Sequence, residues 1–390
     1  MLKKSHKNAA ITLVIILGIV SFLADMTVEG AKSITGAFLA LLGANAFIVG
    51  IVAGAGEFVG YALRLFSGYL VDKTANYWLF TFFGYACNLI GLPLLAFTGN
   101  WRTAAFLIIL ERVGKALRTP ARDAMLSHAS HSIGRGFGFG LHQTFDQLGA
   151  MLGPLIVTLV LFLKGSYRDG FAILFIPGFL AIVALIVASR IYPTPQDLET
   201  SQIASPTKNH TNATFWIYLL ASASLAAGFA DFPIIAYHFA KHAILSATLI
   251  PFSYAVGLGV SSASVLFFGK LYDRLGYVVL IITTVIAAFF PIFVFFGGTA
   301  LAFFGMFLWG IGTGAQSSLL KAIIGDIIPK EKRGRAYGIY NACFGLACFI
   351  GSALMGFLYD ISLFWLVVFS IFMQFLSVII FLVAGIRRAK

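Results

Sequence analysis

The sequence predicts an all-α integral membrane protein that crosses the bilayer about twelve times. Of its 390 residues, 59% are hydrophobic and only 11% are charged, whereas soluble domains have roughly 25% charged residues. Apolar stretches of about 20 residues, the length of a membrane-spanning helix, recur along the chain. The net charge of +12 does not predict nucleic-acid binding, because Lys and Arg occur in short clusters between these stretches.

Charges, prolines, glycines and polar turns bound each apolar stretch and mark the ends of the helices. The first stretch follows Lys3, Lys4 and Lys7 but is longer than a signal peptide, so we expect it to remain as the first helix. A first set of helices is expected near residues 10–38, 45–71, 77–98, 101–123, 136–163 and 170–189. A second set is expected near residues 214–240, 246–272, 277–297, 299–324, 336–358 and 363–385.

A polar, proline-containing segment at residues 190–213 separates the two sets and is too polar to insert into a membrane. We therefore expect two similar six-helix halves, at 1–189 and 214–390, joined by this linker. An even number of crossings puts both termini and the linker on one side of the membrane. Most of the 27 Lys and Arg residues lie on that side, so the positive-inside rule makes it cytoplasmic.

The two halves share loop motifs. A Gly-x-Leu-x-Asp-basic motif follows the second helix of each half, and a Gly-Arg-x-x-Gly motif precedes the fifth. The residues concerned are Gly68, Asp72, Lys73 and Arg135 in the first half, and Gly269, Asp273, Arg274 and Arg335 in the second. The first motif resembles the G-x-L-x-D-[RK] loop signature of the major facilitator superfamily, whose members have two pseudo-symmetric six-helix halves. The resemblance implies a gating role for these residues. It also implies that the protein crosses a bacterial inner membrane several times, and the motifs do not identify its substrate.

Helix 5 carries a second family-like motif. Gly149, Gly153 and Pro154 resemble the G-x-x-x-G-P motif of proton-coupled exporters, and the two glycines favour close helix packing. His142 and Asp146 lie on the same face of this helix, one turn apart. A buried carboxylate next to an imidazole could load and release a proton; alternatively, a His–Asp hydrogen bond only stiffens the helix.

Charged residues inside the membrane are costly and are the main candidates for function. In helix 1, Asp25, Glu29 and Lys32 share one face. Asp25 and Glu29, together with His142 and Asp146 of helix 5, are our candidates for proton coupling. Permanent ion pairs that hold the bundle together are the structural alternative. The substrate-binding candidates are Glu57, Tyr61, Arg64, Glu111, Arg112, Lys115, Asp231 and Tyr237. We expect Arg118 and Arg122, lower on the fourth helix, to belong to the positive-inside collar.

No phosphate-binding loop, metal-ligand cluster or supported nucleophile–base pair is recognisable, so neither a cofactor, a bound metal nor enzyme activity is expected. The favoured hypothesis is a monomeric secondary transporter in which a small molecule and protons cross the lipid bilayer by alternating access. The exporter-like motif of helix 5 slightly favours export over uptake. One alternative is import of an organic anion or siderophore-like metabolite by Arg64, Arg112 and Lys115. An alternative of another class is a non-transporting membrane receptor or assembly protein.

Overall fold

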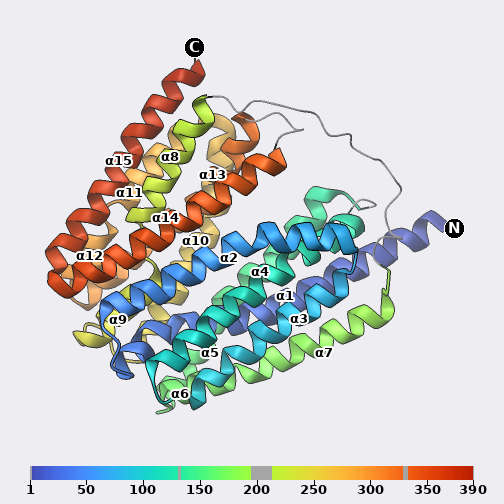
Figure 1. The fold of residues 1–390 in the computed structure, drawn as a ribbon, viewed down its shortest axis with the longest axis horizontal. Helices are drawn as coiled ribbons and strands as arrows, with labels where there is room; N and C mark the ends of the chain where they lie inside the picture. Colours follow the sequence, from blue (N-terminus) through green and yellow to red (C-terminus); the bar gives the residue numbers. More distant parts are fainter. Residues whose placement is uncertain (1, 131–132, 195–212, 328–332, 390) are drawn as a thin grey trace. The chain divides into compact units, whose positions relative to one another are not determined.

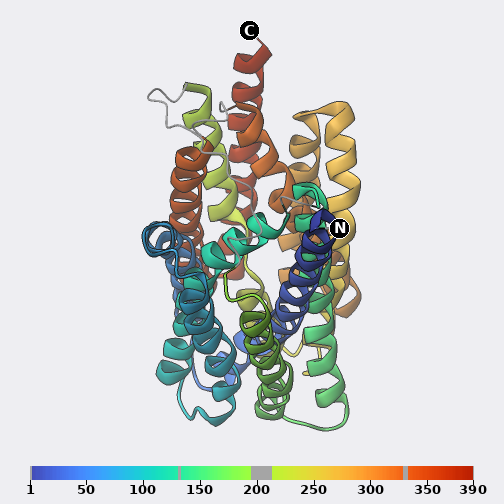
Figure 2. The ribbon, with the colours of Figure 1, turned by 90° about the vertical axis from the view of Figure 1, so that its right-hand side faces the viewer.

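The computed structural model describes residues 2–130, 133–194, 213–327 and 333–389, and over these residues all regular secondary structure is helical (Figure 1, Figure 2). In the first part of the chain the helices are α1 (Leu2–Leu41), α2 (Ala46–Thr74), α3 (Tyr77–Gly91) with the 3₁₀ turn η1 (Pro93–Phe97), α4 (Trp101–Ser130), α5 (Arg135–Phe162), and α6 (Tyr167–Ile173) with α7 (Phe175–Ile191). In the second part they are α8 (Ala213–Gly228) with α9 (Phe232–Lys241), α10 (Leu249–Leu275), α11 (Val278–Ala287) with α12 (Phe290–Phe296), α13 (Thr299–Ile327), α14 (Arg333–Ile361) and α15 (Leu363–Ala389).

These helices confirm the predicted twelve-helix membrane fold. Within the described residues, 10 segments are long and apolar enough to cross a bilayer by length and composition. The two further crossings are α4 and α13. Helix α4 is made polar by its charged residues, and Gly, Thr, Gln and Ser dilute the apolar residues of α13. Polarity inside a crossing helix indicates a surface that faces protein or water rather than lipid.

Four of the predicted helices are interrupted, which corrects the expectation of continuous ones. The break between α8 and α9 is the best defined. Asp231 has extended backbone angles and its carboxylate accepts a hydrogen bond from the Phe232 amide at 2.9 Å, while Pro233 occupies the first turn of α9. The carbonyl of Ala230 accepts a hydrogen bond from the Trp309 indole at 3.1 Å. An Asp cap followed by Pro starts a new helix, so the sequence contained this signal.

Backbone contacts divide the chain into two compact units. Unit 1 comprises Met1–Lys32 and Val59–Ala204, and unit 2 comprises Ser33–Phe58 and Ser205–Lys390. The last part of α1 and the first part of α2 therefore belong to unit 2. The halves expected at 1–189 and 214–390, with a linker at 190–213, stay a prediction; residues 195–212 of that linker lie outside the described residues.

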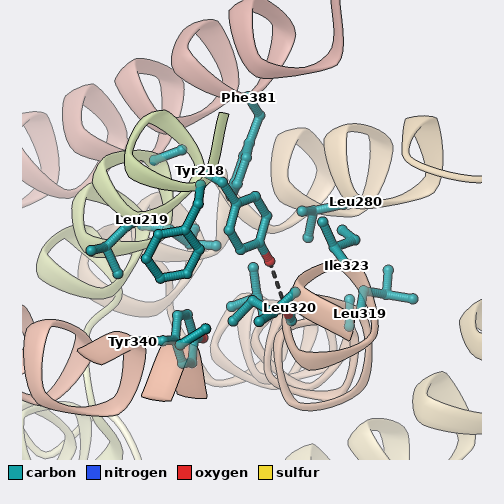
Figure 3. Packing of buried hydrophobic residues seen from close by; sticks show 14 of the residues in the cluster. Tyr218, Leu219, Leu280, Leu319, Leu320, Ile323, Tyr340 and Phe381 are labelled. Carbon is teal, nitrogen blue, oxygen red and sulfur yellow. Dashed lines mark hydrogen bonds between the residues drawn. The ribbon is translucent and has the colours of Figure 1, made fainter. Parts of the chain in front are cut away.

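The core of unit 2 is formed by aromatic and aliphatic side chains from α8, α11, α13, α14 and α15 (Figure 3). Tyr218 lies at its centre, fully buried, and packs against Phe381 with ring centroids 5.6 Å apart. Its hydroxyl donates a 2.7 Å hydrogen bond to the Leu320 carbonyl (Figure 3). This bond satisfies the one polar atom that the ring brings into the core and fixes α8 against α13.

Small residues let the ends of α1 and α2 pack closely within unit 2. A Cβ atom at Gly36 would collide with the Pro233 carbonyl of α9, and one at Gly50 would collide with the Ser352 carbonyl of α14. Asp360, at the end of α14, accepts hydrogen bonds from the first two amides of α2. The two glycine contacts depend on the backbones approaching without an intervening side chain.

Candidate functional site: a charged cluster in unit 1

The candidate site is a cluster of acidic and basic side chains on α1, α4 and α5 of unit 1. On α4, Glu111, Lys115, Arg118 and Arg122 follow one another at intervals of three or four residues and so share a face. Lys115 interacts electrostatically with Asp25 and Glu29 of α1, which brings the predicted helix 1 and helix 4 candidates together.

Close packing of α3 on α4 positions Glu111, which forms an ion pair with Arg112. A Cβ atom at Gly84 would lie 2.6 Å from the Gly114 carbonyl, so both positions require glycine. This close approach lets the Asn88 amide donate a 2.7 Å hydrogen bond to the buried Glu111 carboxylate. The second Glu111 oxygen pairs with Arg112 Nε at 3.0 Å. Both carboxylate oxygens are therefore occupied, and this pair is a structural anchor as well as a candidate for binding.

Arg118 is buried among protein side chains, and its place in the cytoplasmic collar stays a prediction. Its side chain is 1% exposed and its guanidinium lies over the Tyr85 ring, 4.3 Å from the centroid. Its ionic partner is Asp25 of α1, whose Oδ1 lies 3.8 Å from Nη2. This separation is too long for a hydrogen bond. In the described residues, Arg118 Nε and Nη1 have no hydrogen-bond partner.

Arg122 is satisfied by its neighbours. Its guanidinium donates to Asp123 Oδ1 from Nε at 3.0 Å and from Nη2 at 2.8 Å. Nη1 donates to the buried Ser21 hydroxyl of α1 at 3.2 Å. The Asp123 carboxylate is partly exposed, so this pair lies at the edge of the cluster.

The α5 part of the cluster contains the predicted histidine–aspartate pair. His142 Nδ1 lies 3.5 Å from Asp146 Oδ1, and both side chains are largely buried. Asp146 also interacts electrostatically with Asp25 and with Arg122. The carboxylates of α1 and α5 therefore belong to one electrostatic network.

Glycines hold α5 against α1. A Cβ atom at Gly149 would collide with the Phe22 carbonyl, and one at Gly153 would collide with the Met26 carbonyl. Pro154, which follows directly, is buried. The predicted packing glycines thus face the stretch of α1 that carries Asp25, and they fix the spacing between the two carboxylate-bearing helices.

Comparison with known proteins gives the chain its family. The sequence model of the Major Facilitator Superfamily matches residues 14–318 and, in a second match, residues 277–390. The chain belongs to the major facilitator superfamily.

Relatives and solved structures agree with this membership. The protein Rv2265 of Mycobacterium tuberculosis, described as uncharacterized, is 36% identical over 381 residues, which cover 96% of this chain and 93% of that protein. The MFS-type transporter MJ1317 of Methanocaldococcus jannaschii, also described as uncharacterized, is 27% identical. The match covers 90% of this chain and 89% of that protein. The solved structure of a peptide transporter POT variant superposes with a TM-score of 0.77 at 14% identity, over 95% of this chain and 93% of that chain. A variant of the nucleoside transporter NupG gives a TM-score of 0.76 at 13% identity, over 95% of this chain and 99% of that chain. At these identities the two structures show the fold alone, and the family matches point to a transporter rather than an enzyme.

The remaining substrate-binding candidates of this superfamily member lie on α2, at the start of α9 and within α9. In unit 1, the Arg64 guanidinium stacks on Tyr61 of the same helix, 5.2 Å from the ring centroid. Glu57 precedes them on α2 but belongs to unit 2. Also in unit 2, Asp231 caps α9 and Tyr237 is buried, with the Lys241 ammonium 5.2 Å from its ring centroid.

The superfamily loop residues are partly described. Asp72 and Lys73 at the end of α2 and Arg274 at the end of α10 are exposed. The nearest side-chain atom to a Cβ at Gly68 is in Pro120, at 3.8 Å, and nothing lies within 4 Å of one at Gly269. The side chains of Arg135, Asp273 and Arg335 lie outside the described part of the structure.

Sequence reasoning missed the contributions of α3 and of one serine on α1. Tyr85 and Asn88 hold Arg118 and Glu111, and Ser21 accepts a hydrogen bond from Arg122. Tyr85 and Asn88 are three residues apart on one face of an otherwise apolar helix, a polar pattern that marks an interior surface. The signal for α3 was therefore present, although uncharged.

Proposed function

We propose that this superfamily member is a proton-coupled secondary transporter that moves a small molecule by alternating access. The observation that supports this most is the loose ion pair between Asp25 and Arg118, 3.8 Å apart inside a network of opposing charges. Electrostatic repulsion from Asp146 and Glu29 acts on Asp25, whereas Lys115 and Arg118 attract it. A proton on Asp25 removes one charge from this network and so changes the interactions of each of its partners.

In this proposal Asp25 and Asp146 carry the proton, with Glu29 and His142 as their nearest exchange partners. The loop residues Asp72 and Asp273 act as gates together with the basic and glycine residues beside them. The protein lies as a monomer in a bacterial inner membrane, with both termini in the cytoplasm, as the positive-inside rule predicts.

Flux measurements in proteoliposomes test the proposal. An imposed pH gradient should drive uptake or release of a solute, and Asp25→Asn and Asp146→Asn should each lower this flux at least tenfold. Asp169→Asn is the matched control, because the same substitution then lies at the exposed start of α6. If a pH gradient drove no flux of any solute, or if both variants matched the control, coupling through these carboxylates would have to be abandoned.

Direction and substrate rest on different observations. The resemblance of Gly149, Gly153 and Pro154 on α5 to the G-x-x-x-G-P motif of proton-coupled exporters favours export of a small amphipathic compound. The unsatisfied guanidinium of Arg118 favours a second candidate, uptake of an organic anion together with a proton. A receptor or assembly protein with this fold would carry no flux. Flux measurements in the same vesicles therefore distinguish export, anion uptake and a non-transporting protein.

A further inference from the structure

We propose that the substrate carries an anionic group, a carboxylate or a phosphate, and that this group binds Arg118 in exchange for Asp25. This inference rests on the proposed proton-coupled transport and adds the substrate class and a binding residue that sequence reasoning assigned to the cytoplasmic collar. It also predicts that the proton and the anion bind together.

The first argument is the unfilled hydrogen-bonding capacity of Arg118. Its guanidinium is 1% exposed, and an arginine presents five N–H donors and no acceptor. Among the described residues, no acceptor lies in hydrogen-bond reach of Nε or Nη1, and Asp25 stays 3.8 Å from Nη2. Buried charged donors without acceptors are strongly unfavourable. Acceptor oxygens of a bound ligand would satisfy these donors, and carboxylate and phosphate groups supply such oxygens in the geometry that arginine prefers.

The second argument is that the neighbouring arginines of α4 already have acceptors. Arg112 pairs with Glu111 at 3.0 Å, and Arg122 pairs with Asp123 at 2.8 Å. Both pairs consist of sequence neighbours on the same helix. Arg118 differs because its carboxylate partner comes from another helix and is held at a distance.

The third argument is the aromatic support beneath Arg118. The Tyr85 ring lies 4.3 Å from the guanidinium carbon and holds the plane of the group by a cation–π contact. The Tyr85 hydroxyl is itself buried and has no hydrogen-bond partner in the described residues. Two adjacent side chains thus retain donors, which is what an incoming oxyanion needs.

The charges around Asp25 explain why a proton must accompany the anion. The groups that interact with it are Lys115 and Arg118 on α4, Glu29 on α1 and Asp146 on α5. Asp146 in turn pairs with His142 and interacts electrostatically with Arg122. While Asp25 is ionised, it opposes any second anion next to Arg118. A proton on Asp25 removes this repulsion and leaves Arg118 and Lys115 to attract the substrate. An inward proton gradient would then drive uptake, in agreement with the second candidate above.

Ligand-dependent thermal stability of the purified full-length protein tests this exchange without requiring transport. The probes are benzoate and phenyl phosphate, with benzamide as the uncharged analogue of benzoate, each measured at pH 6 and pH 8. We expect one of the two anions to bind about tenfold more tightly at pH 6 than at pH 8, and benzamide not to bind. Which anion binds decides between a carboxylate and a phosphate substrate.

Variants assign the effect to the two residues. Arg118→Gln should abolish the stabilisation by the anion, and Arg118→Lys, which keeps the charge, is the second variant if the first fails to fold. Asp25→Asn, which resembles the protonated residue, should bind the anion equally well at both pH values. Arg102→Gln, at an exposed position of the same helix, should leave binding unchanged.

Equal binding of benzamide, absence of binding by both anions, or retention of anion binding in Arg118→Gln would overturn the inference. Any of these results together with intact pH-driven flux of an uncharged or cationic solute would refute the anionic substrate class alone. Absence of pH-driven flux for every solute would refute the proposed function instead.

Discussion

Replacing Asp360 by alanine should loosen the first turn of α2. The first amides of a helix have no acceptor within the helix. Here Asp360 Oδ1 accepts from the Ala46 amide at 3.2 Å and Oδ2 from the Phe47 amide at 3.0 Å, while Asn45 caps the Ile48 amide at 2.9 Å. Asp360 also places a negative charge at the positive end of the helix dipole. Loss of a capping side chain and of this charge costs about 1–2 kcal/mol at an exposed position.

Hydrogen exchange measures this loss where it occurs. A decrease of about 1–2 kcal/mol in the free energy of local opening corresponds to roughly 5- to 30-fold faster exchange of the two amides. Asp360→Asn, which keeps one acceptor but loses the charge, should give an intermediate rate. Amides in the middle of α10 provide an internal reference, because they are far along the chain from the cap. Unchanged protection of residues 46 and 47 in the alanine variant would refute the capping role.

Two further substitutions test the packing that positions the charged cluster. Gly153→Ala should destabilise the protein by about 1–3 kcal/mol, because its methyl group would collide with the Met26 carbonyl. Gly60→Ala is the control and should be neutral or stabilising, because no atom lies within 4 Å of the added methyl group. Equal melting temperatures of the two variants would contradict the reasoning. Asn88→Ala should cost about 1–2 kcal/mol by removing the hydrogen bond to the Glu111 carboxylate, measured by thermal unfolding in detergent, and a wild-type melting temperature would show that this bond contributes little.

The fold could be predicted from the sequence because lipid imposes a simple requirement on it. Each crossing needs about 20 apolar residues, and the Lys and Arg clusters fix the side on which the loops lie. The paired loop motifs, such as the one at Asp72 and Asp273, then identify the family. The helix breaks were harder to predict, because the segment around Asp231 is apolar enough to read as one helix although it contains a capping residue and Pro233.

The site was only partly predictable, because charge spacing along a helix shows which residues share a face but not which helix they meet. The spacing correctly grouped Glu111 with Lys115 on α4. It could not show that Asn88 approaches from α3, since this depends on the glycine contact between Gly84 and Gly114. The burial of Arg118 could not be predicted for the same reason: Tyr85, which packs on its guanidinium, is a residue of another helix.

These glycine contacts also bear on how the cluster could work. Because α3 packs on α4 and α5 packs on α1 through backbone contacts at Gly114 and Gly153, the helices that carry the charges have little freedom to move apart within unit 1. Asp25 and Arg118 lie on α1 and α4, and rotation of their side chains can close or widen the 3.8 Å gap between them. A proton that binds Asp25 changes the electrostatic energy of this network without first requiring these helices to separate. The energy of that change is then available to bias the larger motion that alternating access requires, because only a ligand with different affinities for two states can shift their equilibrium.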